Sequence, residues 1–319
     1  MRKLKNSYVR IAIILLMVLS LAGPSFNASA SPRASHPPIN LGTTANFAVL
    51  AGSDVNDTTP STVIGDVGLD PATGANIDVT CAEVTGTIYD NDAAYPGLCE
   101  VTNAALLTTA KNDLTTAYND ADNTIPTTNL PGADNQLGGQ TLTDGTYNFG
   151  GATTANLIGT LTLDGQGDPN SVFIFQASST LVTASSSVVS LINGAQACNV
   201  FWQVSTSATF GTATTFVGTV MADQSITDDG GATINGRLLA RIAAVTLNNT
   251  TITRSDCAAA PPEEEEEEEE DVVTGLPDTG GAPIRNEDLT WIPLIVGGFS
   301  VAALALGVRA YRRTQLPKQ

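Results

Sequence analysis

The fold is decided by residues 212–254, which read TATTFVGTVMADQSITDDGGATINGRLLARIAAVTLNNTTITR. Equivalent residues recur there every 18 positions, in two adjacent columns: Phe216, Ile234 and Ile252, and Thr215, Thr233 and Thr251. A strand advances roughly 3.3 Å per residue, so three short strands and their corners fill one interval. The interval therefore predicts stacked coils with three sides, in an all-β domain.

Composition argues against an enzyme and against a nucleic-acid partner. Charged residues make up 14% of the chain and aromatic residues 5%, and the formal net charge is -18. Phosphate binding requires clustered Lys and Arg, but Lys111 is the only lysine between Lys5 and Lys318. The sole histidine, His36, lies in a Pro-rich leader, and no phosphate loop, zinc spacing or EF-hand loop is present. We therefore expect no catalytic residue, no metal site and no cofactor.

Both ends of the chain have the pattern of targeting segments. Basic residues, an apolar run from Ile11 to Ala22 and the small residues 28–30 predict a signal peptide over residues 1–30, followed by the leader 31–39. Residues 289–308 are apolar and uncharged, and they are about long enough to span a bilayer. The basic tail 309–319 would stay in the cytoplasm. The pattern predicts an exported chain with a C-terminal anchor.

A pentapeptide precedes the apolar span: Leu276, Pro277, Asp278, Thr279 and Gly280. The order of pentapeptide, span and basic tail resembles the LPxTG sorting signal of Gram-positive surface proteins. The resemblance implies that a sortase cuts after Thr279 and joins it to peptidoglycan, so that the membrane holds the chain only before sorting. A simple membrane anchor is the alternative. Residues 258–275, rich in Pro and Glu, would be an extended spacer between the domain and the wall.

Four cysteines in an exported chain favour disulfides over metal ligation. We expect Cys81 to pair with Cys99 and Cys198 with Cys257. The coil interval speaks against the second pair, because it places the two residues about three coils and roughly 14 Å apart. A disulfide needs Cα atoms within about 7 Å. An excursion of residues 192–197 or of the tail after the last coil would have to close the gap.

Residues 103–120 are predicted to form the one long helix. Apolar residues recur at helical spacing in Leu107, Ala110, Leu114, Ala117, Tyr118 and Ala121. Several coil strands are apolar on both faces, among them Phe201-Trp202 and Leu238-Leu239, and such a face is not left in water at this length. We infer that the helix covers this side of the coils. The strand at residues 46–52 has the same two-sided pattern and would occupy the slot below Leu238-Leu239, and residues 63–69 are predicted to form a second strand.

The two other sides show small polar residues outward. The Thr209 side contains Thr209, Thr227 and Thr246, and the Thr215 side contains Thr215, Thr233 and Thr251. Each keeps apolar residues inward and presents a flat, uncharged surface. Stacked coils would repeat the threonines at roughly 4.8 Å.

Four segments together resemble one family, the microbial ice-binding proteins with a discontinuous β-solenoid. They are LGTTANFAVLAG (41–52), DLTTAYNDA (113–121), DPNSVFIFQ (168–176) and INGAQACNVFWQV (192–204). The resemblance covers residues 40–257 and implies a right-handed, three-sided discontinuous β-solenoid flanked by one amphipathic α-helix, with N-terminal strands that close the stack. It also implies that the chain binds the surface of ice crystals through a Thr/Ser/Ala-rich side.

Some members of this family repeat the motif Thr-Ala/Gly-x-Thr/Asn, which residues 212–215 match in full and residues 183–186 and 153–156 in part. Candidate ice-binding residues are Thr153, Thr183, Thr209, Thr212, Thr214, Thr215, Thr227, Thr233, Thr246, Thr250 and Thr251. Asp228 and Asp229 interrupt the pattern. We expect these two charges to hold their own hydration shells and to weaken ice binding.

Other functions are compatible with parts of the sequence. Outward threonines also occur simply because β-branched residues suit strands. A wall-displayed adhesin or scaffold would use the same sorting signal, but it would show aromatic or charged hot spots. A polysaccharide lyase would need acidic and arginine residues together, for which Asp223, Asp228, Asp229, Arg237 and Arg241 are the candidates. Our prediction is a monomeric ice-binding protein, secreted and anchored to the cell wall of a Gram-positive cell.

Overall fold

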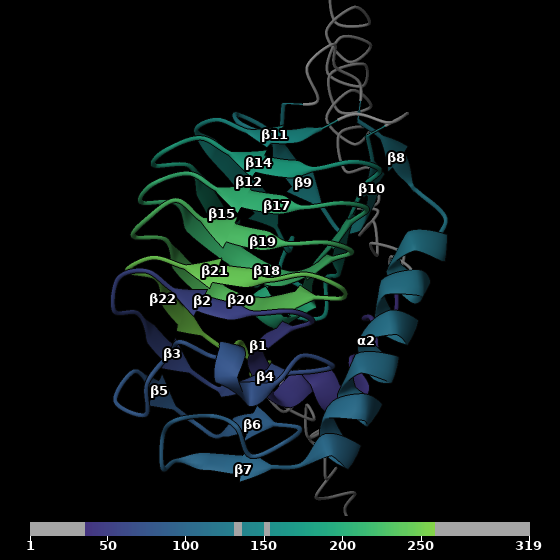
Figure 1. Ribbon diagram of the computed structural model, residues 1–319. Helices are drawn as coiled ribbons and strands as arrows, with labels where there is room; N and C mark the ends of the chain where they lie inside the picture. The colour runs from purple at the N-terminus through teal and green to yellow at the C-terminus, as the bar shows by residue number, and fades with distance from the viewer. Residues whose placement is uncertain (1–35, 131–135, 150–153, 259–319) are drawn as a thin grey trace, which may run out of the picture. The chain divides into compact units, whose positions relative to one another are not determined.

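The computed structural model describes residues 36–130, 136–149 and 154–258. The signal peptide, the spacer, the sorting motif, the apolar span and Thr153 lie outside the described residues. Within the described residues the fold is mostly β, with parallel strands stacked in three ladders around one core and a single long helix alongside (Figure 1). No helix in this part of the chain is long and apolar enough to cross a membrane.

The first ladder lies under the helix and forms the covered side. In spatial order it contains β7 (Glu100–Thr102), β6 (Ile88–Asp90), β4 (Asp66–Leu69), β1 (Phe47–Ala51), the second halves of β20 (Thr233–Ala240) and β18 (Thr215–Ala222), β16 (Val200–Val204), β13 (Phe173–Ala177), β10 (Gly145–Asn148) and β8 (Thr128–Asn129).

The two other ladders form the open sides. The Thr209 side is a six-stranded sheet of β11 (Ala155–Leu157), β14 (Leu181–Thr183), β17 (Ala208–Phe210), β19 (Ile226–Asp228), β21 (Val245–Leu247) and β2 (Val55–Asp57). The Thr215 side contains β9 (Thr141–Thr143), β12 (Thr160–Asp164), β15 (Val188–Ile192), the first halves of β18 and β20, β22 (Thr251–Thr253), β3 (Thr62–Ile64) and β5 (Val84–Thr85). Three short 3-10 helices, η1 (Gly42–Asn46), η2 (Gly74–Asn76) and η3 (Ala197–Asn199), connect strands.

Strands β18 and β20 each belong to two ladders, because each of them bends at a glycine. Gly218 pairs with Gly236, and Gly218 has a φ of 111°, which only glycine adopts without strain. A side chain at Gly236 would collide with the Gly218 carbonyl. The same bend separates β3 from β4 at Gly65, where φ is 134°. The single strand predicted over residues 63–69 is therefore wrong, because its two halves belong to different sides.

The chain enters the stack in the middle rather than at an end. Leu238 pairs with Val49, Thr246 with Asn56 and Thr251 with Thr62. Strands β1, β2 and β3 therefore pair with the strands of the last coil and extend the three ladders. The chain then runs to β7 at one end, crosses along α2 (Ala104–Asn123) and returns in coils from the other end (Figure 1). The order of strands in space thus differs from their order in sequence.

Helix α2 begins where the sequence predicts it and ends three residues later than predicted. The Asn103 side chain accepts a hydrogen bond from Leu106 N and caps the first turn. At the other end Gln176 Nε2 donates to the carbonyls of Ala121, Asp122 and Thr124, which supports the added residues. The six apolar residues predicted to face the coils are the buried residues of α2.

The strands of the covered side contribute side chains to two cores, one on each face. Phe173, Phe175, Trp202, Val220 and Leu238 point into the stack, where the rings of Phe175 and Trp202 lie 4.0 Å apart. Their neighbours on the other face pack beneath α2, and these are Ile174, Phe201, Met221 and Leu239, joined by Phe47 and Leu50 of β1. The helix therefore covers what would otherwise be a continuous apolar surface.

Lys111 and Asp113 attach α2 to distant parts of the chain. Lys111 Nζ donates to the carbonyls of Ala240 and Arg241 at 2.9 and 2.7 Å. Asp113 Oδ2 accepts from the backbone N–H and the hydroxyl of Thr43, both at 2.7 Å. These contacts hold the helix against the middle of the stack and leave the other two sides open.

Two disulfides are formed, Cys81–Cys99 and Cys198–Cys257, with Cα separations of 5.7 and 5.3 Å. The second joins residues that a regular stack would keep three coils apart. Gln196 lies beside the end of the last coil, where its Oε1 accepts from Ala258 N at 2.8 Å. The segment before η3 and the residues after β22 both leave the regular coil path, which closes the gap.

Candidate functional site

The Thr209 side carries two files of small outward residues, one at the middle of each strand and one just before each strand. The middle file runs, in order of pairing, Asn156, Val182, Thr209, Thr227, Thr246 and Asn56. The file before it contains Thr154, Thr180, Ser207, Ser225, Ala244 and Asp54. None of these residues is buried, whereas the residues between them point into the core. The surface is therefore a regular array with one charge, at its last coil.

Side-chain hydrogen bonds join neighbouring coils across the Thr209 side. The Thr180 hydroxyl donates to Thr154 Oγ1 at 2.8 Å, and the Ser225 hydroxyl donates to Ser207 Oγ at 3.0 Å. Asn56 Nδ2 donates to Thr246 Oγ1 at 3.2 Å. These bonds limit the rotamers of the outward groups and so fix the directions in which they offer hydrogen bonds to water.

The Thr215 side is the larger of the two arrays. One file reads Thr160, Val188, Thr215, Thr233, Thr251 and Thr62, and a parallel file reads Thr141, Thr162, Ser190, Val217, Asn235, Thr253, Ile64 and Thr85. Thr215, Thr233 and Thr251 are exposed, as predicted. The predicted set did not include Thr62, Thr85, Thr141, Thr160, Thr162 and Thr253. Alternation along each strand identifies Thr253, whereas Thr62 and Thr85 join the array only because N-terminal strands enter the stack.

Three of the candidate threonines are not on the surface. Thr183, Thr214 and Thr250 are 3%, 0% and 0% exposed at the corner between the two open sides, so none of them belongs to an open surface. Thr183 Oγ1 and Thr214 Oγ1 lie 2.8 Å apart, and the Thr214 hydroxyl also donates to the Gly211 carbonyl. At this corner the three hydroxyls point inward, where they can bond backbone groups that the turn leaves without a partner. Thr212 stays exposed on the outer side of the same turn.

Asp228 does not interrupt either array. Its side chain is 2% exposed, and the carboxylate accepts hydrogen bonds from Gly230 N, Ala232 N and the Thr250 hydroxyl at 2.9, 3.0 and 2.6 Å. The expectation that Asp228 disturbs surface water is wrong, since its charge is turned inward and is held by these donors. Asp229 is exposed, but it lies on the turn beyond the last residue of β19.

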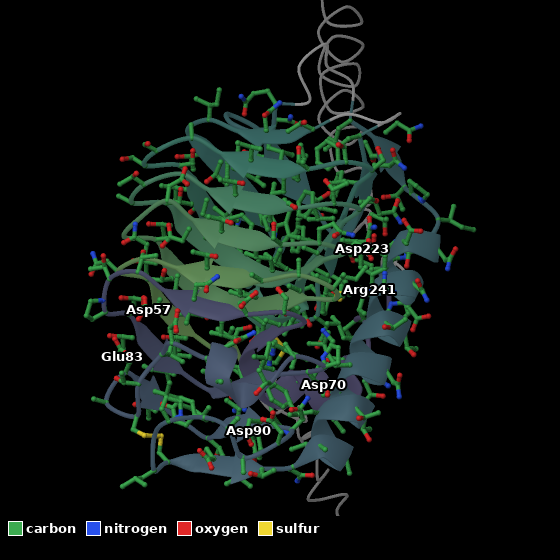
Figure 2. All side chains as sticks on the ribbon, viewed as in Figure 1. Asp57, Asp70, Glu83, Asp90, Asp223 and Arg241 are labelled. Atoms are coloured by element: carbon green, nitrogen blue, oxygen red, sulfur yellow. A yellow bond between two sulfur atoms is a disulfide. The ribbon has the colours of Figure 1, made fainter. Side chains whose placement is uncertain are left out.

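The groups considered for a lyase do not converge on a site. Arg241 forms an ion pair with Asp223 at 2.6 Å (Figure 2). Its guanidinium also lies over the Tyr118 ring, 4.5 Å from the ring centroid. Arg237 is buried and donates to the Ala45 carbonyl. Asp228 accepts hydrogen bonds from Gly230, Ala232 and Thr250 at the corner between the two open sides. Four of the five groups thus have a structural partner, and Asp229 is exposed on a turn away from them. The described residues contain no cluster of three or more His, Cys, Asp or Glu side chains that would hold a metal.

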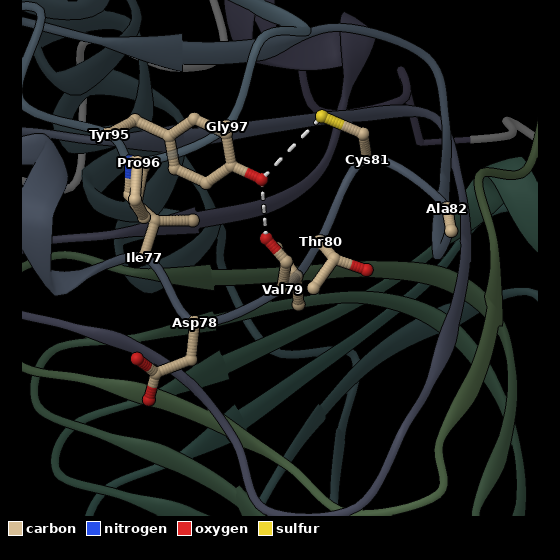
Figure 3. Close-up of a pocket in the computed structure, with 9 residues that line it drawn as sticks. All are labelled: Ile77, Asp78, Val79, Thr80, Cys81, Ala82, Tyr95, Pro96 and Gly97. Carbon is tan, nitrogen blue, oxygen red and sulfur yellow. Dashed lines mark hydrogen bonds between the residues drawn. The ribbon is translucent and has the colours of Figure 1, made fainter.

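A small cavity of about 340 Å³ lies in the insert closed by Cys81–Cys99, between residues 77–82 and 95–97 (Figure 3). The Tyr95 hydroxyl donates to the Val79 carbonyl at 2.9 Å and lies 3.9 Å from Cys81 Sγ. That sulfur is in the disulfide and is not a free nucleophile. The cavity therefore supplies no catalytic pair, and the flat sides remain the candidate functional surfaces.

Comparison with known proteins decides the family. The model of the family described as Ice-binding-like matches residues 49–253. The chain belongs to this family. It is 40% identical over 215 residues to an ice-binding protein of Flavobacterium frigoris, an alignment that covers 67% of this chain and 76% of that protein. An ice-binding protein of Colwellia sp is 37% identical over 252 residues, which are 79% of this chain and 95% of the relative.

Solved structures of Ice-binding-like relatives agree with the fold. An ice-binding protein from an Antarctic biological consortium has a TM-score of 0.61 and 40% identity, over 70% of this chain and 94% of that one. An ice-binding protein from an Arctic yeast has a TM-score of 0.62 at 29% identity, over 70% and 96%. The relatives share the β-solenoid with this chain and are named for ice binding rather than for a reaction, and this chain is not an enzyme.

Proposed function

We propose that this chain is an ice-binding protein whose right-handed, three-sided solenoid adsorbs to ice through the Thr209 side. The observation that carries the proposal is the flat, nearly uncharged array of Thr, Ser and Asn on six parallel strands in unbroken register. Hydroxyls at a regular spacing hold water molecules while the adjacent methyl groups order the water around them. Each contact is weak, but a layer held in register merges with the crystal, and many contacts together make adsorption effectively permanent.

The positions of the first and last segments of the described domain favour the Thr209 side over the Thr215 side. Residues 38–41 and 255–257 line one cavity, at the edge where the Thr215 side meets the covered side. Helix α2 lies over the covered side. Of the two open sides, the Thr209 side is the one that does not adjoin these two segments, although α2 contacts Arg241 at its corner, so a crystal can lie against it without meeting residues 38–41 or 255–257.

Slow freezing onto a cold surface tests this proposal with purified residues 31–279. We expect the protein to enter the ice. The Thr227→Tyr variant should lose partitioning by about tenfold or more, which corresponds to 1.4 kcal/mol or more of binding free energy, because a ring at the centre of the Thr209 side breaks its flatness. Thr233→Tyr, in the next strand but on the Thr215 side, is the matched control and should partition normally.

The reverse result, loss with Thr233→Tyr alone, would assign ice binding to the Thr215 side. Exclusion of the unaltered protein from ice would reject the proposal and leave an adhesin or scaffold as the better description.

We further propose that the mature chain is joined to a Gram-positive cell wall through Thr279, with residues 258–275 as a spacer. The sequence of residues 276–319 supports this, in the order of pentapeptide, apolar span and basic tail. In a sortase-containing Gram-positive host, the protein should appear in the wall fraction and be released by peptidoglycan hydrolase. Thr279→Ala should move it to the membrane fraction. An equal distribution of both proteins would show a simple membrane anchor instead.

A further inference from the structure

The described chain begins and ends at one place in the fold. A cavity of about 440 Å³ is lined by Pro38–Leu41 from the start and by Ser255–Cys257 from the end. Arg237 of β20 links the two segments, because its buried guanidinium donates to the Ala45 carbonyl at 2.9 and 3.0 Å and to the Ser255 hydroxyl at 3.2 Å. Everything that follows residue 258 in sequence is therefore connected to the domain at this edge.

The last described residues are attached to a different coil from the strand that precedes them. Cys257 is bonded to Cys198 in η3, and Ala258 N donates to Gln196 Oε1 at 2.8 Å. Strand β22 lies elsewhere, between β20 and β3, and has only three residues. The disulfide is a second covalent path beside the backbone, so a force on Ala258 passes to Cys198 as well as to β22.

The disulfide also closes a covalent ring that contains half of the residues of the proposed ice-binding surface. Its two cysteines are 59 residues apart in sequence, and β16 to β22 lie between them. Thr209, Thr227 and Thr246 are all inside the ring. When a force pulls these residues away from Ala258, the two chain segments that connect them around the ring share it. The ring therefore lengthens only if both segments leave the stack together.

We propose that Cys198–Cys257 is a mechanical clamp, through which tension between a bound ice crystal and the cell surface enters the domain without unravelling it. This inference rests on the proposed function, since ice at one side and an anchor beyond residue 258 supply the two opposed forces. Without the clamp, tension on Ala258 acts first on β22 and then on β21, which are three-residue strands. The C-terminal coils would then peel away one after another, and with them the ice-binding residues.

Single-molecule pulling tests the clamp on residues 31–279, because solved relatives that consist almost wholly of this domain fold alone. One handle is a click-reactive residue at Thr116, on the exposed face of α2, and the other is the C-terminus or, in a second geometry, the N-terminus. The clamp-free variant is Cys198→Ala/Cys257→Ala. The matched control is Cys81→Ala/Cys99→Ala, which removes the disulfide that lies outside the ring.

Pulled from the C-terminus, the clamp-free variant should lengthen at lower force than the unaltered protein. It should do so in steps of about one coil, roughly 60 Å each, that sum to roughly 200 Å for the 59 residues of the ring. The unaltered protein and the control should show no such early steps. Pulled from the N-terminus, the clamp-free variant and the unaltered protein should unfold at the same force.

Equal weakening in both pulling directions would overturn the proposal, because the disulfide would then be a general stabiliser. Absence of early steps would overturn it as well. If the clamp-free variant fails to fold, reducing the folded control protein during pulling removes the same bond and gives the same comparison. Failure of ice binding or of wall attachment appears in the freezing and fractionation experiments, which apply no tension, and so is distinguished from failure of the clamp.

Discussion

Asp228 contributes to stability rather than to the surface. Its carboxylate is the acceptor for two backbone N–H groups and the Thr250 hydroxyl at a buried corner. Asp228→Ala leaves these donors without a partner, and we expect it to lower the free energy of unfolding by about 3 kcal/mol. Urea titration measures this. The exposed neighbour is the control: Asp229→Ala should change stability by less than about 0.5 kcal/mol.

The same pair of variants also tests the location of the charge. While folded, Asp228→Ala should partition into ice as the unaltered protein does. A change in partitioning without a change in stability would show that Asp228 reaches the surface water after all.

Lys111 makes stability depend on pH. The pKa of Lys111 is lowered from its usual 10.5 to about 8, chiefly by burial; nearby Asp70 opposes the shift and Arg241 adds to it. The folded-state pKa is thus below the unfolded one, so the unfolded chain binds more protons between these values and stability rises with pH. From pH 8 to 9.5 the free energy of unfolding should increase by about 1.5 kcal/mol. Tyr95 and Tyr118, whose pKa values burial raises, stay protonated in this window.

Chemical denaturation at several pH values measures this slope. Lys111→Met removes the titrating group and should flatten it, although the loss of the bonds to the Ala240 and Arg241 carbonyls lowers stability at every pH. An unchanged slope in Lys111→Met would assign the pH dependence to another group.

At the scale of the element, α2 is the cover of one side and has no part in the proposed ice contact. Leu114 is fully buried in the core beneath the helix. Leu114→Ala should cost about 3 kcal/mol of unfolding free energy, from lost burial and the cavity that remains. Thr116→Ala, on the exposed face two residues away, should cost little. Both variants should enter ice normally at low temperature; a selective loss in Leu114→Ala would mean that α2 shapes the ice-binding side.

The helix was predictable because its periodicity is a local property. Six apolar residues at helical spacing identify both the element and its buried face. Its end was not predictable, because the donor to its last carbonyls is Gln176, more than 50 residues away. The bends at Gly65 and Gly218 were not predictable either, because a glycine in the sequence indicates a change of side only when the neighbouring coils are known.

At the scale of the whole molecule, the first and last segments of the described domain lie together, which predicts that the domain tolerates a new connection. We expect a circular permutant that joins Ala258 to Pro38 by a short Gly/Ser linker, and opens the exposed turn between Gln166 and Gly167, to fold and bind ice. Circular dichroism and freezing onto a cold surface measure both properties. A permutant that stays unfolded would show that the entry of β1 into the stack depends on the order of synthesis or on the native connection.

The sequence alone determined the repeat, the apolar columns, the covering helix and the two Thr-rich sides, because strand and helix periodicity follow from neighbours a few residues apart. It did not determine which corner residues are buried, how Asp228 is held, how β1 to β3 enter the stack or how Cys198 reaches Cys257. Those features depend on contacts between coils that are distant in sequence, and only the tertiary structure brings their donors, acceptors and side chains together. The Thr-rich sides are thus visible in the sequence, whereas which of their threonines are exposed follows from the fold.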